Sequence, residues 1–384
     1  MIRILYIVPT LKRCGPANQV YNLIKYLDRS IFRPILITLS PEPADSRWQD
    51  FEELGVKLYT LGLLRIRTRL CMILPPATRI GHFLAISKLK RIIAKLDVHI
   101  IHTQGIRADI IAAMYLGGYK TVATIRSYPC CDYPMSYGKI VGHLSALYHI
   151  KRLSGIDSLV TVSNSISNML SARNNFTIDV IQNGVDTDIF YPPVNDKFRE
   201  ELRRKLGIPL TKKVFISAGH LTLRKNPLTI IKAFQDKHLS KACYIVFLGD
   251  GPLMNRCKKY GKHGNTIFFG SLPNVAEYLQ ACDFFISSSQ AEGLPNATME
   301  AMACGLPCVL SDIEAHREIV EYNPKSAKLF DTKNVSMAVS KIKEILKGNY
   351  SEMSRAAISI IRDNLNAKTM SEKYQSLYLK ICAH

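Results

Sequence analysis

The stretch that decides the fold is residues 284–320, which read FFISSSQAEGLPNATMEAMACGLPCVLSDIEAHREIV. An apolar run that ends at Ser287 predicts a buried parallel strand that meets a loop. Pro295 then opens a segment of good helix formers that ends at Gly305, where glycine can cap a helix. A second apolar run, Pro307–Leu310, follows directly. The predicted order is strand, helix, strand, which places the first loop at the carboxyl end of a sheet, where open α/β sheets bind ligands.

Two carboxylates lie in this unit. Glu292 precedes the helix and Glu300 is more than one turn inside it. The amino end of a helix between them is a ready site for a phosphate, and carboxylates accept hydrogen bonds from hydroxyl groups. This combination suits a nucleotide-linked sugar. The alternative is that Glu292 interacts with the helix dipole and Glu300 is a solvated helix residue, and the two carboxylates alone leave both readings open.

Composition indicates a two-domain globular protein. The chain has 384 residues, 47% hydrophobic and 21% charged, and strand-like and helix-like patterns alternate in both halves, which predicts two α/β layer structures. A stiff Pro192-Pro193 pair places the domain boundary near residues 187–193. The formal charge of +20 is compatible with nucleic acid, an anionic membrane surface or anionic substrates.

The cysteine spacing and the lengths of the apolar segments predict the cellular compartment. The ten cysteines show no CxxC pair and no metal-ligand spacing, so we expect reduced thiols in a cytoplasmic protein. Met1–Val8 is apolar but runs straight into a loop, as a first strand does, and is not expected to be a signal peptide. No apolar run of about 18 residues occurs, so no transmembrane helix is expected.

Polar residues follow several predicted strands of the amino-terminal half. Gly15 lies in a loop after the first strand and lets backbone approach a ligand, although many α/β proteins have such a turn. His102 taken alone favours a buried structural histidine. Arg126 is a stronger candidate for an anion or acceptor contact, because buried arginines need partners. Asp132 and Tyr133 follow in the next loop.

Two segments mix basic and apolar residues in the way that suits an anionic membrane interface. One is Leu61–Leu96 and the other is Tyr137–Leu153. The alternative for each is a helix with a solvated basic face over the core. The basic residues of the first segment, which has no acidic residue, are Arg65, Arg67, Arg69, Arg79, Lys88, Lys90, Arg91 and Lys95.

In the carboxyl-terminal half, cations follow the first predicted strand. Arg224 and Lys225 stand in a loop after the strand Val214–Gly219 and before a helix, where they can reach a diphosphate. Gly249 opens a glycine-rich turn after the next strand, which backbone or ligand can approach closely.

Four motifs in order now suggest a family. The set resembles the family 4 glycosyltransferases, retaining enzymes of the GT-B fold, over essentially the whole chain. The motifs are Asn183-Gly184-Val185-Asp186, Arg224-Lys225-Asn226-Pro227, Gly249-Asp250-Gly251-Pro252-Leu253 and Glu292-Gly293-Leu294-Pro295 through Glu300.

The resemblance implies an α/β protein with two Rossmann-like domains that face each other across a cleft. Residues 1–187 are expected to form the acceptor-binding domain and residues 191–367 the sugar-nucleotide-binding domain. Residues 368–384 are expected to form a helix that packs back on the amino-terminal domain.

The resemblance also assigns roles to residues. Glu292 is expected to hold donor-sugar hydroxyls and Glu300 the ribose hydroxyls, while Arg224 and Lys225 neutralise the diphosphate. No metal or cofactor is expected, because the sugar nucleotide is a substrate. Further donor-binding candidates are Gly15, Pro16, Gly219, Gly249, Leu272, Gly293, Leu294, Pro295 and Asn296. Acceptor-side candidates are His102, Arg126, Asp132 and Tyr133.

This chain departs from the family pattern at two places. Gly15-Pro16 stands where members commonly have a Gly-Gly pair. Arg126 stands where many members have a histidine. A role like that of the histidine does not carry over to Arg126, which we expect to hold a phosphate of a lipid-linked acceptor instead.

The expected function is retaining transfer of a hexose or N-acetylhexosamine from a nucleotide-sugar, most commonly a UDP-sugar, to a lipid-linked or growing glycan. The resemblance implies bacterial surface polysaccharide synthesis, such as O-antigen or capsule, on the inner face of the cell membrane. One alternative is a GT-B sugar-nucleotide epimerase. Another is a non-catalytic basic protein that binds membranes or nucleic acid, although no nucleic-acid-binding module is visible.

Overall fold

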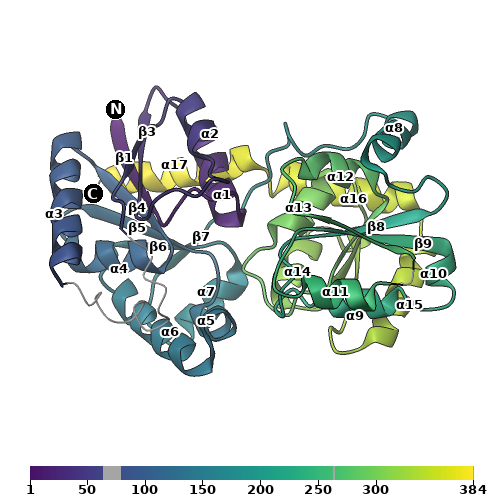
Figure 1. Ribbon diagram of the computed structural model, residues 1–384. Coiled ribbons are helices and arrows are strands. Elements are labelled where there is room, and N and C mark those ends of the chain that lie inside the picture. The colour runs from purple at the N-terminus through teal and green to yellow at the C-terminus, as the bar shows by residue number, and fades with distance from the viewer. Residues whose placement is uncertain (64–78, 263, 384) are drawn as a thin grey trace. The chain divides into compact units, whose positions relative to one another are not determined.

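The computed structural model describes residues 1–63, 79–262 and 264–383, and of residues 79–84 only the helical backbone. The chain divides into two compact units (Figure 1). Unit 1 comprises Met1–Asn183 together with Ala367–His384, and unit 2 comprises Gly184–Asn366.

Unit 1 contains a parallel sheet of seven strands in the order β3-β2-β1-β4-β5-β6-β7. The order runs outward in both directions from β1 and β4, as in doubly wound α/β folds. Its strands are β1 (Ile2–Val8), β2 (Phe32–Thr38), β3 (Lys57–Thr60), β4 (Ile100–Gln104), β5 (Lys120–Ile125), β6 (Ser158–Thr161) and β7 (Ile178–Val180). Its helices are α1 (Gly15–Lys25), α2 (Trp48–Glu53), α3 (Arg79–Leu96), α4 (Ile106–Tyr115), α5 (Pro129–Tyr137), α6 (Lys139–Leu153), α7 (Asn164–Ser171) and α17 (Ala367–Ala383).

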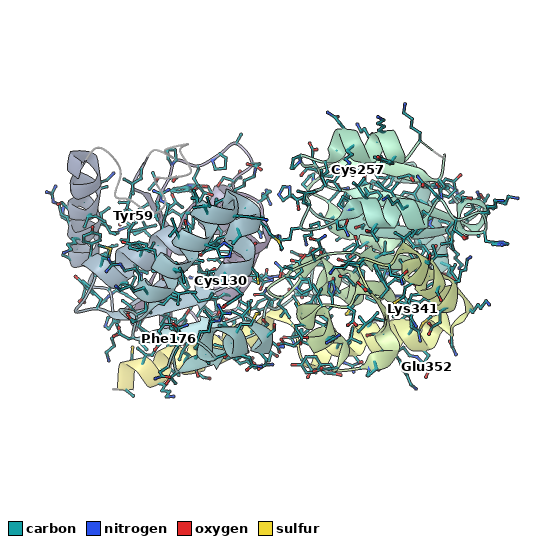
Figure 2. The ribbon with its side chains drawn as sticks, turned by 90° about the horizontal axis from the view of Figure 1, so that it is seen from below. Tyr59, Cys130, Phe176, Cys257, Lys341 and Glu352 are labelled. Atoms are coloured by element: carbon teal, nitrogen blue, oxygen red, sulfur yellow. The ribbon has the colours of Figure 1, made fainter. Side chains whose placement is uncertain are left out.

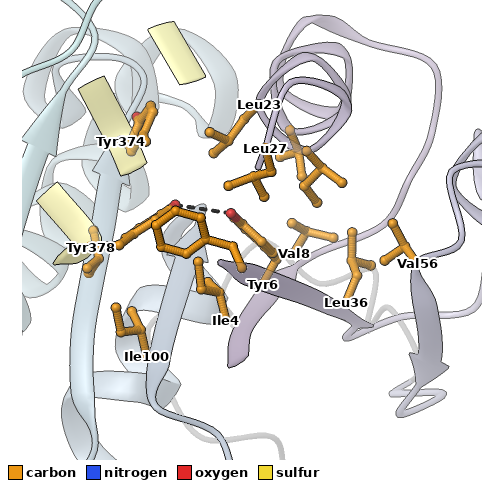
Figure 3. Close-up of a cluster of buried hydrophobic side chains, with 14 of the residues drawn as sticks. Ile4, Tyr6, Val8, Leu23, Leu27, Leu36, Val56, Ile100, Tyr374 and Tyr378 are labelled. Carbon is orange, nitrogen blue, oxygen red and sulfur yellow. Dashed lines mark hydrogen bonds between the residues drawn. The ribbon is translucent and has the colours of Figure 1, made fainter. Parts of the chain in front are cut away.

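The last helix, α17, packs on the strands of unit 1, as the resemblance implied. A buried polar network holds it there. Tyr378 Oη lies 2.6 Å from His102 Nδ1 on β4 and 3.2 Å from Tyr6 Oη on β1, and Tyr374 Oη lies 2.9 Å from Thr124 Oγ1 on β5. The tyrosine rings pack among apolar side chains of β1, β2 and α1 (Figure 3). The carboxyl end of the chain is therefore part of the core of unit 1.

Unit 2 contains a parallel sheet of six strands in the order β10-β9-β8-β11-β12-β13. Its strands are β8 (Lys213–Ala218), β9 (Cys243–Leu248), β10 (Thr266–Gly270), β11 (Phe284–Ser287), β12 (Cys308–Ser311) and β13 (Ala327–Phe330). Its helices are α8 (Asp196–Leu206), α9 (Pro227–Ala233), α10 (Leu239–Ala242), α11 (Met254–Tyr260), α12 (Val275–Ala281), α13 (Asn296–Ala303), α14 (Glu314–Val320), the 3₁₀ turn η2 (Pro324–Ser326), α15 (Val335–Lys347) and α16 (Tyr350–Asp363).

The predicted strand, helix, strand order of residues 284–320 is confirmed as β11, α13 and β12. Pro295 directly precedes α13, and Gly305 follows its cap residue with a φ of +78°, which glycine adopts without strain. The Gly305 N–H donates to the Met302 carbonyl, and the Leu306 N–H donates to the Ala301 carbonyl. These two bonds make a Schellman motif, so glycine terminates α13 as the sequence predicted.

Side chains of both units are shown in Figure 2, with Cys130 and Cys257 among those labelled. Every cysteine among the described residues is a free thiol. In the part of the chain that the structure describes, no helix has both the length and the apolar character to cross a membrane. The predicted membrane contact at Arg65, Arg67 and Arg69 lies outside the described residues.

Candidate active site

The candidate donor site lies where the strand order of unit 2 reverses. Strands β8 and β11 are neighbours, with Phe285 in register with Ile216, while β9 and β12 lie on their outer sides. Arg224 and Lys225 lie in the loop that follows β8, and Glu292 lies in the loop that follows β11. Both loops leave the carboxyl ends of adjacent parallel strands, which is the general position of ligand sites in open α/β sheets.

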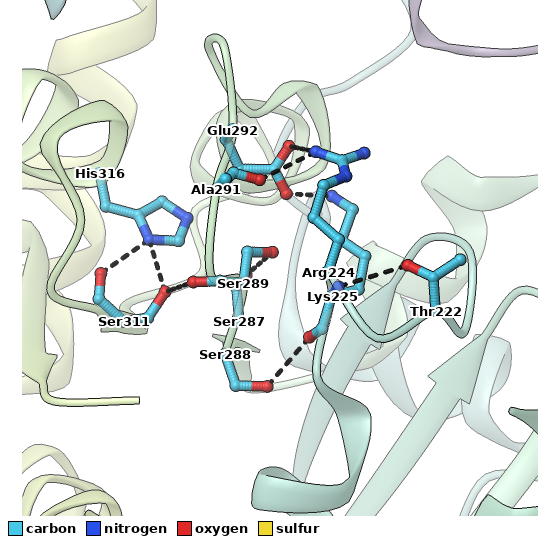
Figure 4. A network of polar contacts seen from close by, with 10 residues as sticks. All are labelled: Thr222, Arg224, Lys225, Ser287, Ser288, Ser289, Ala291, Glu292, Ser311 and His316. Atoms are coloured by element: carbon cyan, nitrogen blue, oxygen red, sulfur yellow. Dashed lines mark hydrogen bonds and ion pairs between the residues drawn. The ribbon is translucent and has the colours of Figure 1, made fainter. Parts of the chain in front are cut away.

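Glu292 forms ion pairs with both Arg224 and Lys225 (Figure 4). Arg224 Nη1 donates to Glu292 Oε2 at 3.0 Å and to the Ala291 carbonyl at 2.9 Å. Lys225 Nζ lies 2.5 Å from Glu292 Oε1. The Glu292 side chain is only 8% exposed, whereas Arg224 is 31% and Lys225 23% exposed. The carboxylate is therefore buried between two cations that still face solvent.

This arrangement keeps Glu292 ionised. Burial raises the pKa of the carboxyl group, but the charges of Lys225 and Arg224 and hydrogen bonds from Lys225 and Ser289 outweigh it and lower the pKa to about 2. At neutral pH both carboxylate oxygens accordingly act as hydrogen-bond acceptors.

The loop that carries the cations is tied to the loop that carries the carboxylate. Ser288 Oγ donates to the Asn226 carbonyl at 2.7 Å, and the Gln290 N–H donates to the Arg224 carbonyl at 2.8 Å. Asn226 has a φ of +48°, a left-handed conformation that is uncommon outside glycine. Such a backbone persists when its surroundings hold it, and here these two hydrogen bonds help to do so.

Two predicted glycines of the site pack against each other. A Cβ atom on Gly249, which has a φ of +134°, would lie 2.1 Å from the Gly219 carbonyl oxygen. Gly219 has the same φ, and a Cβ atom on it would lie 3.6 Å from Lys225 Cε, an ordinary contact distance. Gly249 therefore needs glycine for both packing and backbone conformation, and Gly219 needs it for its backbone conformation.

Glu300, the second predicted carboxylate, lies in α13. Burial raises its pKa to about 7, and the Lys225 charge offsets only part of this effect. Glu292 and Glu300 thus have different protonation at neutral pH, although both are influenced by Lys225.

The remaining donor-side candidates of unit 2 lie in two loops and at the first residue of α13, which is Asn296. Gly293–Asn296 lead into α13, whose amino end carries a partial positive charge. Leu272 is partly buried in the loop between β10 and α12.

The structure adds one residue that the sequence did not single out. His316 on α14 is fully buried, and its Nδ1 lies 2.8 Å from the Ser311 carbonyl oxygen, to which it donates. Ser311 Oγ donates in turn to the Ser289 carbonyl at 2.6 Å, in the loop that leads to Glu292. Figure 4 shows these contacts beside the ion pairs. Burial lowers the pKa of His316 to about 4, so the ring is neutral at pH 7 and acts as a donor that holds this loop.

In unit 1, His102 is part of the core. It is fully buried, and both ring nitrogens are used, Nδ1 by Tyr378 Oη and Nε2 by Thr124 Oγ1 at 2.8 Å. Burial and the charge of Arg126 lower its pKa to about 3. The geometry gives His102 a structural role, one of the two readings that the sequence left open.

Arg126, at the end of β5, is held by neutral groups. Its Nε and Nη2 donate to Gln104 Oε1 at 2.9 and 2.6 Å, and its Nη1 donates to Asn183 Oδ1 at 2.8 Å. Among the described residues it forms no ion pair, and burial lowers its pKa. A partly buried guanidinium without a carboxylate partner is suited to an incoming anion.

The other amino-terminal candidates are spread over two elements. Gly15 and Pro16 form the first turn of α1. Asp132 and Tyr133 lie on α5, where Asp132 Oδ2 accepts a hydrogen bond from Ser127 Oγ at 3.1 Å. The hydroxyl of Tyr133 is buried and lies 2.7 Å from His149 Nδ1. That hydroxyl is therefore engaged inside the unit. In the described part of the chain, no three His, Cys, Asp or Glu residues are grouped so that they could hold a metal ion.

Models of known protein families match most of the chain, one model mainly in each unit. The model for Glycosyltransferase Family 4 matches residues 14–189, and the model for Glycosyl transferases group 1 matches residues 198–363. The chain belongs to the family 4 glycosyltransferases. It is therefore a glycosyltransferase of a retaining family, as its motifs predicted.

This glycosyltransferase has relatives among curated proteins. It is 26% identical over 389 residues to the O-antigen biosynthesis glycosyltransferase WclY of Escherichia coli, with 98% of each chain covered. It is 26% identical over 304 residues to the UDP-Gal:alpha-D-GlcNAc-diphosphoundecaprenol alpha-1,3-galactosyltransferase of Escherichia coli, which covers 76% of this chain and 78% of that enzyme.

Solved structures confirm the GT-B fold. A glycosyltransferase from Rickettsia africae ESF-5 superimposes with a TM-score of 0.77 at 20% identity, over 99% of this chain and 98% of that one. Anabaena Alr3699/HepE in complex with UDP superimposes with a TM-score of 0.75 at 16% identity, over 99% of this chain and 100% of that one.

Proposed function

We propose that this glycosyltransferase transfers a hexose or N-acetylhexosamine from a UDP-sugar, with retention, to a lipid-linked or growing glycan in surface polysaccharide synthesis. The observation that carries the proposal is the buried Glu292 carboxylate between Arg224 and Lys225 at the strand reversal of unit 2. The names of the relatives support the substrate classes, since one acts in O-antigen biosynthesis, one uses UDP-Gal and a diphosphoundecaprenol-linked acceptor, and one was crystallised with UDP.

The two parts of the donor need protein groups of opposite charge: an anionic acceptor for the sugar hydroxyls and cations for the diphosphate. An ionised Glu292 accepts hydrogen bonds from sugar hydroxyls, and the partly exposed Arg224 and Lys225 lie beside it for the diphosphate. The ion pairs fix both cations before the donor arrives, so little reorganisation remains for the reaction. Glu300 is proposed to hold the ribose hydroxyls, and the Gly293–Asn296 backbone to contact the diphosphate at the amino end of α13.

The chemistry follows from charge development. As the bond between the sugar and the diphosphate breaks, negative charge grows on the leaving diphosphate, and cations placed beforehand stabilise it most in the transition state. The acceptor hydroxyl attacks the same face that the diphosphate leaves, which retains the anomeric configuration. The leaving phosphate oxygen takes the proton of the acceptor hydroxyl.

Arg126 is proposed to contact a phosphate of the lipid-linked acceptor. Its guanidinium is held by the amide oxygens of Gln104 and Asn183 and by no carboxylate among the described residues. A phosphate would supply the missing negative charge. The acceptor would then be presented at an anionic membrane surface, on the cytoplasmic face where nucleotide-sugars are available.

The test is transfer from UDP-sugars by purified variants. We expect Glu292→Ala and Lys225→Ala each to lower kcat/KM by about 10³-fold or more, since each removes a charged group from the reacting site. The matched control is Lys325→Ala, which breaks an exposed ion pair of unit 2 with Glu352 and should leave kcat/KM unchanged.

Wild-type turnover in either site variant, with unchanged circular dichroism, would contradict the site assignment. Release of a modified sugar nucleotide without acceptor glycosylation would indicate the epimerase instead.

A further inference from the structure

Helix α6 exposes large apolar side chains on one face. Ile140 is 78% exposed, Leu144 53% and Leu147 61%. Their spacing of four and three residues places them in one stripe along the helix. Isolated exposed apolar residues are ordinary on protein surfaces, but a continuous stripe on a helix indicates an interaction site.

In the first half of α6, where the stripe lies, the opposite face is made of small residues. Gly142, Ser145 and Ala146 are buried beside the exposed stripe, and His149, Ile150 and Leu153 are buried in the second half of the helix. A Cβ atom on Gly142 would lie 2.4 Å from backbone atoms of Pro134, so α6 packs directly against the backbone of α5. This close packing leaves no room for the leucines to turn inward.

A buried hydrogen-bonded chain fixes the rotation of α6 about its axis. His149 Nε2 lies 3.0 Å from Asp109 Oδ2 on α4, and His149 Nδ1 lies 2.7 Å from Tyr133 Oη on α5. Asp109 Oδ1 also accepts a hydrogen bond from Thr103 Oγ1 at 2.6 Å. Rotation of α6 would break these buried bonds, so the exposed stripe is a fixed feature of the fold.

The charges beside the stripe are positive. Lys139, His143 and Lys151 are exposed on the same side of α6, and the helix, which reads KIVGHLSALYHIKRL, contains no acidic residue. A stripe of branched apolar residues flanked by basic residues matches the boundary between acyl chains and anionic headgroups. The same charges disfavour burial against a second copy of this basic chain, which has a net charge of +20.

We propose that the α6 face, defined as Lys139, Ile140, His143, Leu144, Leu147 and Lys151, docks on an anionic lipid bilayer. Ile140, Leu144 and Leu147 enter the boundary with the acyl chains, and Lys139 and Lys151 contact lipid phosphates. The inference deepens the proposed function, since it names the surface through which unit 1 meets the membrane that carries a lipid-linked acceptor.

The experiment is sedimentation of the full chain with vesicles of phosphatidylcholine alone or mixed with phosphatidylglycerol. We expect binding to the mixed vesicles that weakens with added salt. Ile140→Ser, Leu144→Ser and Leu147→Ser combined should reduce the partition coefficient by about 100-fold, because three apolar side chains no longer enter the lipid. The matched control is Val194→Ser with Leu210→Ser, which removes exposed apolar side chains from unit 2 and should change nothing.

Vesicle binding is independent of the proposed chemistry, so the two can fail separately. Equal vesicle binding by the triple variant and the wild type would overturn the α6 face, even if UDP-sugar binds. Absence of wild-type binding to anionic vesicles would also overturn it. If the wild type is a dimer and the triple variant is a monomer, while both bind vesicles equally, the α6 face is a contact between two copies of this chain and not a membrane contact. Loss of UDP-sugar binding with normal vesicle docking would instead contradict the proposed function.

Discussion

The pKa of Glu300 leads to a prediction about how donor binding depends on pH. Burial raises this pKa to about 7, so about half of the carboxyl groups are ionised at pH 7 in the free protein. If the ionised form accepts hydrogen bonds from ribose hydroxyls, a UDP-sugar binds that form preferentially. Acidification should therefore weaken binding, and alkaline conditions should strengthen it.

The magnitude follows from the ionised fraction. With a pKa of about 7, this fraction rises from about 0.1 at pH 6 to about 0.9 at pH 8, so the apparent Kd should fall about tenfold over this range. Glu292 and His316 do not contribute, because their pKa values of about 2 and about 4 lie well below the range.

The assay is isothermal calorimetry with an intact UDP-sugar and no acceptor. An intact UDP-sugar is preferable to UDP because its diphosphate, esterified at both ends, does not titrate near pH 7. The matched control is Glu300→Gln, which has no titrating group and should bind with the same, weaker affinity at pH 6 and pH 8. An unchanged Kd for the wild type between pH 6 and pH 8, or the same pH dependence in Glu300→Gln, would show that Glu300 does not contact the donor in its ionised form.

Three further substitutions test how the fold holds the site, each measured by thermal unfolding. His316→Leu removes one of the two donors to the buried Ser311 carbonyl, which keeps the Ile313 N–H, and should cost about 0.5–1.5 kcal/mol, whereas His316→Asn keeps a side-chain donor and should cost less; equal losses would contradict the donor role. Gly249→Ala places a Cβ atom 2.1 Å from the Gly219 carbonyl and should destabilise unit 2 by about 2 kcal/mol or more, so a neutral effect would show that the loops can separate. Tyr378→Phe removes two buried hydrogen bonds of α17 and should cost about 1–3 kcal/mol, and an unchanged midpoint would show that apolar packing alone holds the helix.

Much of the fold was predictable because proline, glycine and serine residues mark the ends of many helices and strands. The apolar run that ends at Ser287, the proline at 295 and the glycine at 305 mark the ends of β11 and α13, and these are local signals. Helix α5 was not predicted, because its sequence, PCCDYPMSY, contains two prolines. Pro129 stands in its first turn, where no N–H is needed, and Pro134 inside the helix removes one backbone donor and packs against Gly142.

For the candidate site, the sequence and the resemblance propose residues and roles but do not indicate how the side chains pair. The sequence placed Glu292 at the sugar and Arg224 and Lys225 at the diphosphate. It could not show that all three meet, because 68 residues separate Arg224 from Glu292 and their contact depends on β8 and β11 being neighbours. His316 gave no signal, since a single histidine on a helix is most often an ordinary core residue, and its role depends on a bond to Ser311.

The proposed function requires that unit 2 bind a sugar nucleotide through Glu292. The most direct measurement is a calorimetric and thermal-shift screen with UDP, GDP and ADP and their common sugars, without added metal. We expect one UDP-sugar to bind more tightly than UDP alone, and this gain to disappear in Glu292→Ala while UDP binding remains. Absence of binding by every sugar nucleotide, or an equal gain in Glu292→Ala, would contradict it.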